Sequence, residues 1–192
     1  MRKELIEQLK AYIPFNEQEE KDKDIILHFL SEYDDIYLRS DLVAHMTASA
    51  WVVNSTMDKV IMAYHNLYRS YSWLGGHADG DEDLVHVAIK EVQEESGISN
   101  VRALSEDIFS IEILSVEGHF KRGQYVPSHL HLNVTYLLQA DENESLHIKE
   151  DENSAVGWFG LEEAVEKSNE IFFKENIYNK LNSKLLLWRD KK

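Results

Sequence analysis

Residues 76–98 constrain the fold of this chain more than any other stretch of its sequence. They read GHADGDEDLVHVAIKEVQEESGI, so a glycine-rich turn leads into an amphipathic middle and then into Gly97. The apolar residues 71–74 just before the turn suit a short strand, and glycine suits the left-handed position that ends a helix. The stretch therefore predicts a strand, a tight turn and a helix over residues 83–96.

The predicted helix carries an acidic stripe beside an apolar one. At about 100° per residue, Glu91, Glu94 and Glu95 fall within an arc of about 100°. The neighbouring stripe is expected to be buried and consists of Val85, Ala88, Ile89, Val92 and Ser96. Three like charges at this spacing repel one another, and Mg²⁺, which prefers carboxylate and phosphate oxygens, would relieve the repulsion. The acidic face therefore suits a metal ion that holds a phosphate.

Residues at the start of this stretch support the same interpretation. Asp79, Asp81 or Asp83 can cap the helix by accepting a hydrogen bond from its first free N–H groups. Gly75 and Gly76 allow the backbone to turn tightly and to approach a ligand closely. The sequence thus predicts a helix start that faces a ligand.

The remaining sequence predicts a mixed sheet with helices on its faces. The polar residues 54–58 lie between two apolar runs and predict a hairpin, whereas residues 118–128 are expected to form a loop. The strands are expected at 45–53, 59–65, 71–74, 108–117, 129–139 and 155–159. The helices are expected at 3–12, 17–32, 83–96, 161–167 and roughly 175–189.

The first part of the chain predicts a helical extension. Residues 1–36 contain two amphipathic segments separated by Pro14, and we expect them to pack on a single globular unit formed by residues 37–192. The alternative is that these helices form the contact of a homodimer.

Composition excludes several classes of function. The chain has no cysteine, which excludes disulfides, zinc–thiolate sites and thiol nucleophiles. A formal net charge of −15 argues against long nucleic acid as a partner, but a small phosphorylated molecule bound through a cation is compatible with it. No apolar run approaches the roughly 18 residues that a membrane span needs. The lack of cysteine and of a signal-peptide pattern at the start favours a cytoplasmic location.

The stretch 76–98 resembles the Nudix box, G-x5-E-x7-R-E-U-x-E-E-x-G-U, where U is a bulky aliphatic residue. Lys90 is the one departure, because the family has Arg at that position. The order of strands over roughly residues 38–170 also resembles the α/β/α sandwich of the family. The residues that match the box are Gly76, Glu82, Glu91, Val92, Glu94, Glu95, Gly97 and Ile98.

The resemblance implies hydrolysis of a nucleoside diphosphate linked to another group. Mg²⁺, or alternatively Mn²⁺, would be held by Glu91, Glu94 and Glu95, and the carbonyl of Gly76, or alternatively of Gly75, could add a ligand. Such ions neutralise pyrophosphate and lower the pKa of a bound water, which attacks phosphorus in line. Among the box residues, Glu94 and Glu91 are expected to be catalytic. The residues that complete the structural motif are Gly75, Glu82, Lys90 and Gly97.

The resemblance is also compatible with two other activities on the same scaffold. An isomerase of the isopentenyl-diphosphate type relies on a cysteine in this family, and the chain has none. A catalytically weak or inactive nucleotide sensor is the remaining alternative. Lys90 favours it, because lysine keeps the charge of arginine but lacks its planar fork. The complete set of three box glutamates argues against a sensor.

Residues outside the box are further candidates. Glu152, in the acidic stretch before the last strand, is expected to be a general base or an extra ligand; an acidic surface loop is the alternative. His129 and His131 are two apart on a strand and so share one face, where they line the substrate cleft or form a metal site with His119.

Lys121 and Arg122 lie in a glycine-flanked loop and are candidates for contact with a phosphate or a ribose, with solvated loop charges as the alternative. The same box serves ADP-ribose, dinucleoside polyphosphates, nucleotide sugars, oxidised nucleoside triphosphates and coenzyme-linked diphosphates. Selectivity is expected to depend on residues 66–72 and 118–128, so the sequence leaves the substrate open.

Overall fold

The computed structural model describes residues 1–121 and 123–191. Its helices are α1 (Arg2–Ala11), α2 (Glu17–Glu32), α3 (Leu84–Ser96), α4 (Leu161–Lys167), α5 (Ile171–Phe173), a π-helical turn (Lys174–Tyr178) and α6 (Asn179–Arg189). Its strands are β1 (Ala44–Val53), β2 (Lys59–His65), β3 (Ser70–Ser72), β4 (Leu74–His77), β5 (Val101–Ala103), β6 (Ser110–Val116), β7 (His119–Lys121), β8 (Gln124–Val126), β9 (His129–Ala140) and β10 (Asn153–Gly160).

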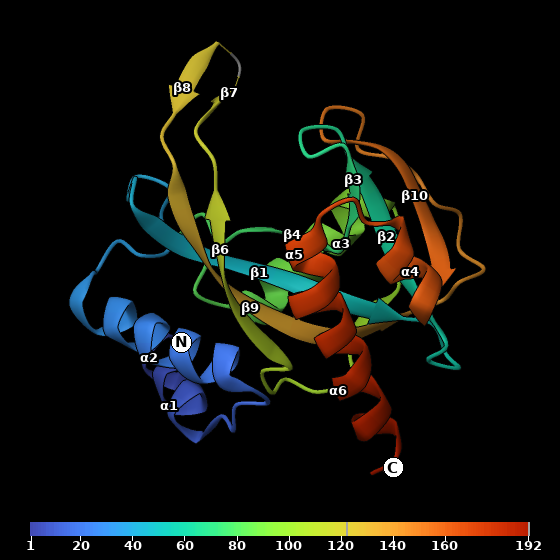
Figure 1. Cartoon of the computed structure of the whole chain (residues 1–192), viewed down its shortest axis with the longest axis horizontal. Helices are drawn as coiled ribbons and strands as arrows, with labels where there is room; N and C mark the ends of the chain where they lie inside the picture. Colours follow the sequence, from blue (N-terminus) through green and yellow to red (C-terminus); the bar gives the residue numbers. More distant parts are fainter. Residues whose placement is uncertain (122, 192) are drawn as a thin grey trace.

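The centre of the protein is an eight-stranded mixed sheet. Its main strand order is β10-β2-β1-β9-β5, with β3 paired to β2, β4 paired to β1 and β6 paired to β9. The long strands β1 and β9 run parallel over ten residue pairs, from Ala44 opposite Leu130 to Val53 opposite Gln139. The other pairs are antiparallel, and β7 and β8 form a separate hairpin that projects from the sheet (Figure 1).

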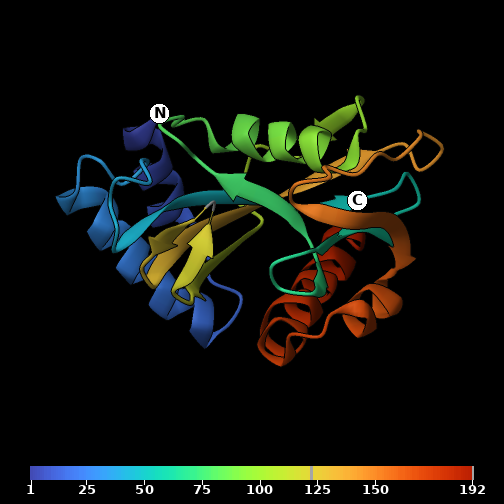
Figure 2. The ribbon, with the colours of Figure 1, turned by 90° about the horizontal axis from the view of Figure 1, so that it is seen from above.

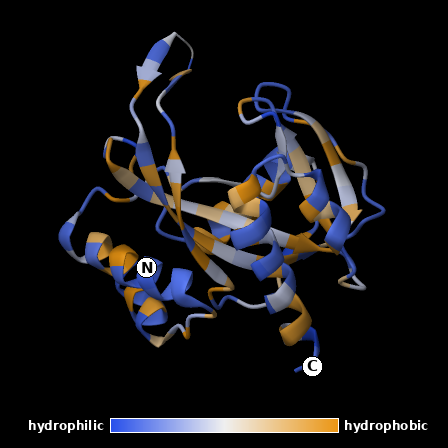
Figure 3. Ribbon diagram, in the orientation of Figure 1, coloured by the Kyte–Doolittle hydropathy of each residue, from blue (hydrophilic) through white to orange (hydrophobic). Residues whose placement is uncertain are grey.

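Helices cover both faces of this sheet. Helix α3 lies on one face, while α4 and α6 lie on the other (Figure 2). All ten residues of β1 are buried because alternate side chains enter different clusters: Met46 and Ala48 pack with α3, whereas Trp51 and Val53 pack with α6. Orange and blue both occur on the N-terminal helices, the central strands range from white to orange, and the last residues beside the C-terminus are blue (Figure 3).

A buried ion cluster joins the N-terminal helices to the rest of the protein. Glu19 on α2 is fully buried and lies 2.6 Å from Lys184 Nζ and 3.3 Å from Lys180 Nζ, both on α6. Lys180 also pairs with the buried Glu112 on β6 at 2.9 Å. Burial alone would raise the pKa of Glu19, but Lys184 and Lys180 outweigh it and lower the pKa to about 2. Helices α2 and α6 are therefore linked through buried charges, and removing either partner would leave the other charge unpaired.

The predicted fold class is confirmed, and the differences are local. Residues 118–128 contain the hairpin of β7 and β8 rather than a plain loop, and residues 71–74 take part in two strands, β3 and β4. The last helical region begins at Ile171 and includes the π-helical turn, and β5 was not expected. These elements are three to five residues long, too short for a clear periodic pattern.

Leu9 and Ile26 of the first two helices belong to the same apolar cluster as α3. A division of the chain after residue 36 nevertheless stays a prediction. None of the helices within residues 1–121 and 123–191 combines the length and the apolar character that a membrane crossing requires.

Candidate active site

Helix α3 has the ends that its sequence predicted. The side chain of Asp83 accepts a hydrogen bond from the His86 N–H and caps the first turn. Gly97 ends the helix in the left-handed region with a φ of 74°, and a Cβ there would lie 2.8 Å from the Cβ of His147. The capping residues therefore fix where the acidic face of α3 begins and ends.

Two glycines of β4 allow this acidic face to touch the sheet. A Cβ on Gly75 would lie 2.6 Å from the backbone carbonyl oxygen of Ala48, and a Cβ on Gly76 would lie 2.6 Å from Glu91 Oε1. Both distances are shorter than real Cβ contacts: at Gly75 the obstacle is backbone, which requires glycine, whereas at Gly76 it is the end of the Glu91 side chain, which a Cβ would displace. The carboxylate of Glu91 consequently occupies the space that a side chain on Gly76 would fill.

Glu95 is buried, although the helical wheel places it on the acidic stripe and outside the apolar one. Only 6% of the residue is exposed, and its Oε2 accepts a hydrogen bond from the Gly75 N–H at 3.0 Å. Burial raises the pKa of Glu95 to about 8, although the bond from Gly75 acts in the opposite direction. Burial also raises the pKa of Glu91, although the charge of Lys149 acts in the opposite direction.

The apolar stripe of α3 faces the core as predicted: Ala88, Val92 and Ser96 are buried, and Val85 and Ile89 are half-buried.

A lysine outside the box connects the box to the acidic loop. Lys149 Nζ lies 3.2 Å from Glu94 Oε2 and 2.9 Å from Glu152 Oε2. Partial burial lowers the pKa of Lys149, but the carboxylates of Glu152 and Glu94 outweigh burial and raise it. Lys90 lies farther from Glu94, with its Nζ 3.6 Å from Oε1. The structure therefore brings Glu152 to the box glutamates, where the sequence alone could not place it.

These carboxylates line a cleft of about 900 Å³. His129, His131 and Lys121 line the same cleft, whereas Arg122 lies outside the described residues. Glu82 does not reach the cleft: its Oε2 accepts a hydrogen bond from the Arg2 backbone N–H at 2.9 Å. Glu82, although it matches the box, thus holds the start of α1 by a hydrogen bond instead of facing the cleft.

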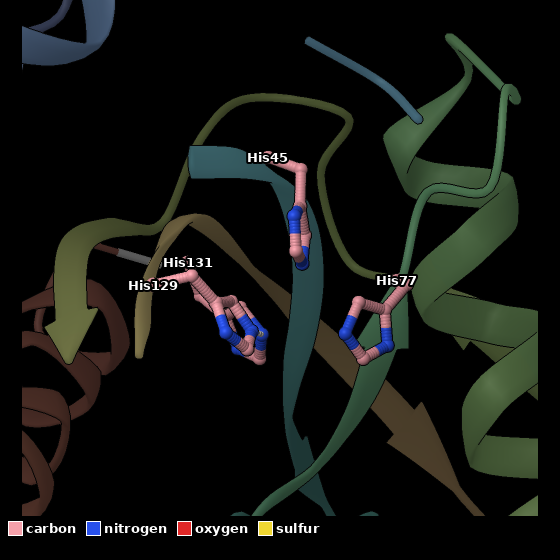
Figure 4. Close-up of side chains that lie close together, drawn as sticks. All are labelled: His45, His77, His129 and His131. Atoms are coloured by element: carbon pink, nitrogen blue, oxygen red, sulfur yellow. Dashed lines mark hydrogen bonds between the residues drawn. The ribbon is translucent and has the colours of Figure 1, made fainter. Parts of the chain in front are cut away.

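The cleft also contains four histidines from three strands. His45 of β1, His77 of β4, and His129 and His131 of β9 have ligand atoms that all lie within 4.8 Å of one another. Their rings point toward a common centre (Figure 4). Burial lowers the pKa of His77 to about 3 and that of His131 to about 2, so both imidazoles are neutral at pH 7. His119 lines the cleft but is not part of this cluster.

Sequence reasoning missed His45, His77 and Lys149. His45 was read only as the start of a strand and His77 only as a variable residue of the box. A signal was present, because His45, Thr47 and Ser49 alternate on one face of the strand as His129 and His131 do on theirs.

Comparisons with known proteins identify the class of protein. The family model of the NUDIX domain matches residues 43–181, well over half of the chain. The chain therefore belongs to the Nudix family and is an enzyme of the Nudix hydrolase type. A curated relative from Lactococcus lactis subsp. cremoris, described as "Probable DHNTP pyrophosphohydrolase", is 25% identical over 179 residues, which cover 92% of this chain and 100% of the relative.

Solved structures share the fold. An Ap4A hydrolase from C. elegans, in a binary complex, is 17% identical and covers 77% of this chain and 98% of its own, with a TM-score of 0.52. An ADP-ribose pyrophosphatase from Streptococcus suis is 19% identical and covers 77% of this chain and 93% of its own, also with a TM-score of 0.52. At these identities the likeness shows the architecture alone.

Proposed function

We propose that the chain hydrolyses a pyrophosphate bond in a nucleoside diphosphate linked to another group, with a divalent cation held by Glu91, Glu94 and Glu95. The observation that supports this most directly is the ion-paired bridge of Lys149. It joins Glu94, in the box, to Glu152, in a distant loop, with distances of 3.2 and 2.9 Å. Carboxylates from two separate segments thus meet at one wall of the cleft.

The donors at this wall fit a hard divalent cation such as Mg²⁺ or Mn²⁺. All are carboxylate oxygens, and the carbonyl of Gly76 is a further candidate because this glycine contacts the Glu91 carboxylate directly. Burial raises the pKa of Glu95, so its negative charge would gain from a positive partner. A bound cation would supply that partner. It would also offset the charge of the pyrophosphate and acidify the attacking water.

The remaining roles belong to the chain's own residues. We assign Glu152 as the group that accepts the proton of the attacking water, and Glu91 and Glu94 as the box residues that orient the reacting groups. Lys149 keeps Glu152 next to Glu94 and acts as a positioning residue. Lys121, His129 and His131 line the cleft and are assigned to substrate contacts.

The substrate is proposed only as a class. The names of the similar proteins contain DHNTP, Ap4A and ADP-ribose. Each of these compounds contains a phosphoanhydride bond, and each carries a nucleoside or a pterin-type group. These three compounds and a nucleotide sugar form a sensible first panel. The cytoplasmic location and the homodimer stay predictions.

The test is product release from this panel with Mg²⁺, with Mn²⁺ and with a chelator. We expect turnover of at least one compound. This turnover should require the metal and should be abolished in Glu94→Gln. A matched control is Glu163→Gln, which removes one carboxylate from the exposed part of α4. Tight nucleotide binding without turnover across the panel would instead identify the sensor. Equal turnover in the wild type and in Glu94→Gln would refute the assigned site.

A further inference from the structure

Three strands of the central sheet bring four imidazoles together at one end of the cleft. His45 lies opposite His131 in the parallel pairing of β1 with β9. His77 lies opposite Thr47, two residues further along β1, and His129 precedes His131 by one strand repeat on the same face. The cluster is therefore fixed by backbone pairing within the sheet rather than by a surface loop (Figure 4).

Hydrogen bonds to the backbone determine which ring nitrogens of His45 and His129 can bind a metal ion. The Nδ1 atom of His45 lies 3.0 Å from the Asp41 carbonyl oxygen, and that of His129 lies 2.8 Å from the Pro127 carbonyl oxygen. Because a carbonyl only accepts, both Nδ1 atoms must carry the proton and donate it. Each of these rings then has a lone pair on Nε2. This is the arrangement by which proteins orient metal-binding histidines.

The cluster leaves the lone pair of His45 without a partner. The Nε2 of His45 is buried and has no hydrogen-bond partner among the described residues. The Nε2 of His129 lies 3.2 Å from the Nε2 of His131, where only one hydrogen can be shared. A buried acceptor without a donor is unfavourable by about 1–3 kcal/mol, so the cluster is poorly satisfied by protein groups alone.

We propose that His45, His77, His129 and His131 form a second metal site, for a divalent transition metal of the Zn²⁺ class, separate from the carboxylates of α3. Tetrahedral coordination with metal–nitrogen distances of about 2.0–2.1 Å places ligand nitrogens roughly 3.3 Å apart. The distance of 3.2 Å between His129 and His131 matches this value, and the widest distance in the cluster, up to 4.8 Å, would have to shorten when the ion binds.

The donor types separate the two sites chemically. Imidazole nitrogens suit Zn²⁺, Cu²⁺ and Ni²⁺, whereas carboxylate and carbonyl oxygens suit Mg²⁺ and Mn²⁺. The new site requires no pyrophosphate hydrolysis and can be tested without it.

The test is metal binding to the full chain after removal of metals with a chelator. Calorimetric titration should show one Zn²⁺ per chain bound at the histidines, and Mg²⁺ should not compete for it. Co²⁺, used as a spectroscopic probe, should show the visible absorption of a nitrogen-ligated tetrahedral ion. Absence of Zn²⁺ binding by the folded wild type would overturn the proposal.

Matched variants locate the ion. His45→Gln and His131→Gln should weaken Zn²⁺ binding by about 100-fold or more, because even outer-shell partners of such ligands change affinity by about 10- to 100-fold. His119→Gln removes a histidine from the same cleft but outside the cluster and should leave the affinity within about 2-fold. A loss of Zn²⁺ binding in Glu94→Gln, but not in His131→Gln, would place the ion at α3 and refute the site.

A second measurement covers the case in which the histidine variants fail to fold. Diethylpyrocarbonate modifies free imidazoles, and peptide mapping reports each histidine of the wild type separately. Zn²⁺ should protect the four histidines of the cluster and leave the exposed His86 reactive. Equal modification of the cluster with and without Zn²⁺ would contradict the proposal.

Discussion

The buried carboxyl group of Glu95 should make the metal-free protein less stable as the pH rises. Its pKa is about 8 in the folded protein, against 4.5 when unperturbed, because the group is buried. Below about pH 4.5 the group is protonated in both states and contributes nothing. Between 4.5 and 8 the unfolded chain loses this proton while the folded protein keeps it, so the free energy of unfolding falls. At about 1.4 kcal/mol per pKa unit, the total loss is about 5 kcal/mol.

Glu95→Gln removes this ionisation and keeps an oxygen that can accept the bond from the Gly75 N–H. We therefore expect the variant to gain stability relative to the wild type as the pH rises from 5 to 8, by several kcal/mol. The assay is urea unfolding of both proteins in a chelator at each pH. A constant difference between them over this range would refute the reasoning.

Metal and a neighbouring variant provide the controls for this experiment. Glu94 lies on the same helix, but its side chain is 41% exposed, so Glu94→Gln should change the free energy of unfolding by less than about 1 kcal/mol. Adding Mg²⁺ should stabilise the wild type far more than Glu95→Gln, because a ligand stabilises only the state that binds it. Equal stabilisation of the two proteins by Mg²⁺ would show that Glu95 is not a metal ligand.

Three further predictions follow from individual residues. Gly76→Ala should abolish turnover with little loss of stability, because its Cβ meets the mobile end of Glu91. Gly75→Ala should instead destabilise the protein, because its Cβ meets the backbone of β1. Measurements of kcat and of urea unfolding distinguish the two variants. Lys90→Arg should maintain or raise kcat, and a fall of about 10-fold or more would show that the site depends on lysine. Glu19→Gln should destabilise the protein by about 3–5 kcal/mol at pH 7. The contribution of Glu19 is complete above about pH 4.5 and is lost as the pH falls toward 2, so acid unfolding curves of wild type and variant should converge there.

Local patterns made much of the fold predictable. The polar residues 54–58 between two apolar runs indicated the hairpin, and β2 occupies the expected residues 59–65. Helix α3 was predictable because its periodicity, its cap at Asp83 and its end at Gly97 all agree. Each of these signals lies within a single short segment, where spacing alone determines which side chains are neighbours.

The features that escaped prediction depend on contacts between distant segments. A helical wheel gives the direction of Glu95 but not the depth at which Gly75 and the sheet enclose it. The approach of Lys149 to Glu94 depends on the path of the chain between α3 and β10. The meeting of His45 with His131 depends on the parallel register of β1 with β9, which the sequence does not reveal.

The register of β4 explains why the two proposed sites occur together. Gly75, Gly76 and His77 are consecutive, and they lie opposite Ser49, Ala48 and Thr47 of β1. A slip of one residue would exchange the faces of all three. It would turn His77 away from the histidine cluster and would move Gly76 from the position that the Glu91 carboxylate approaches. The same pairing that admits the carboxylates of α3 therefore also completes the histidine cluster, so a change that disturbs one site through β4 should disturb the other.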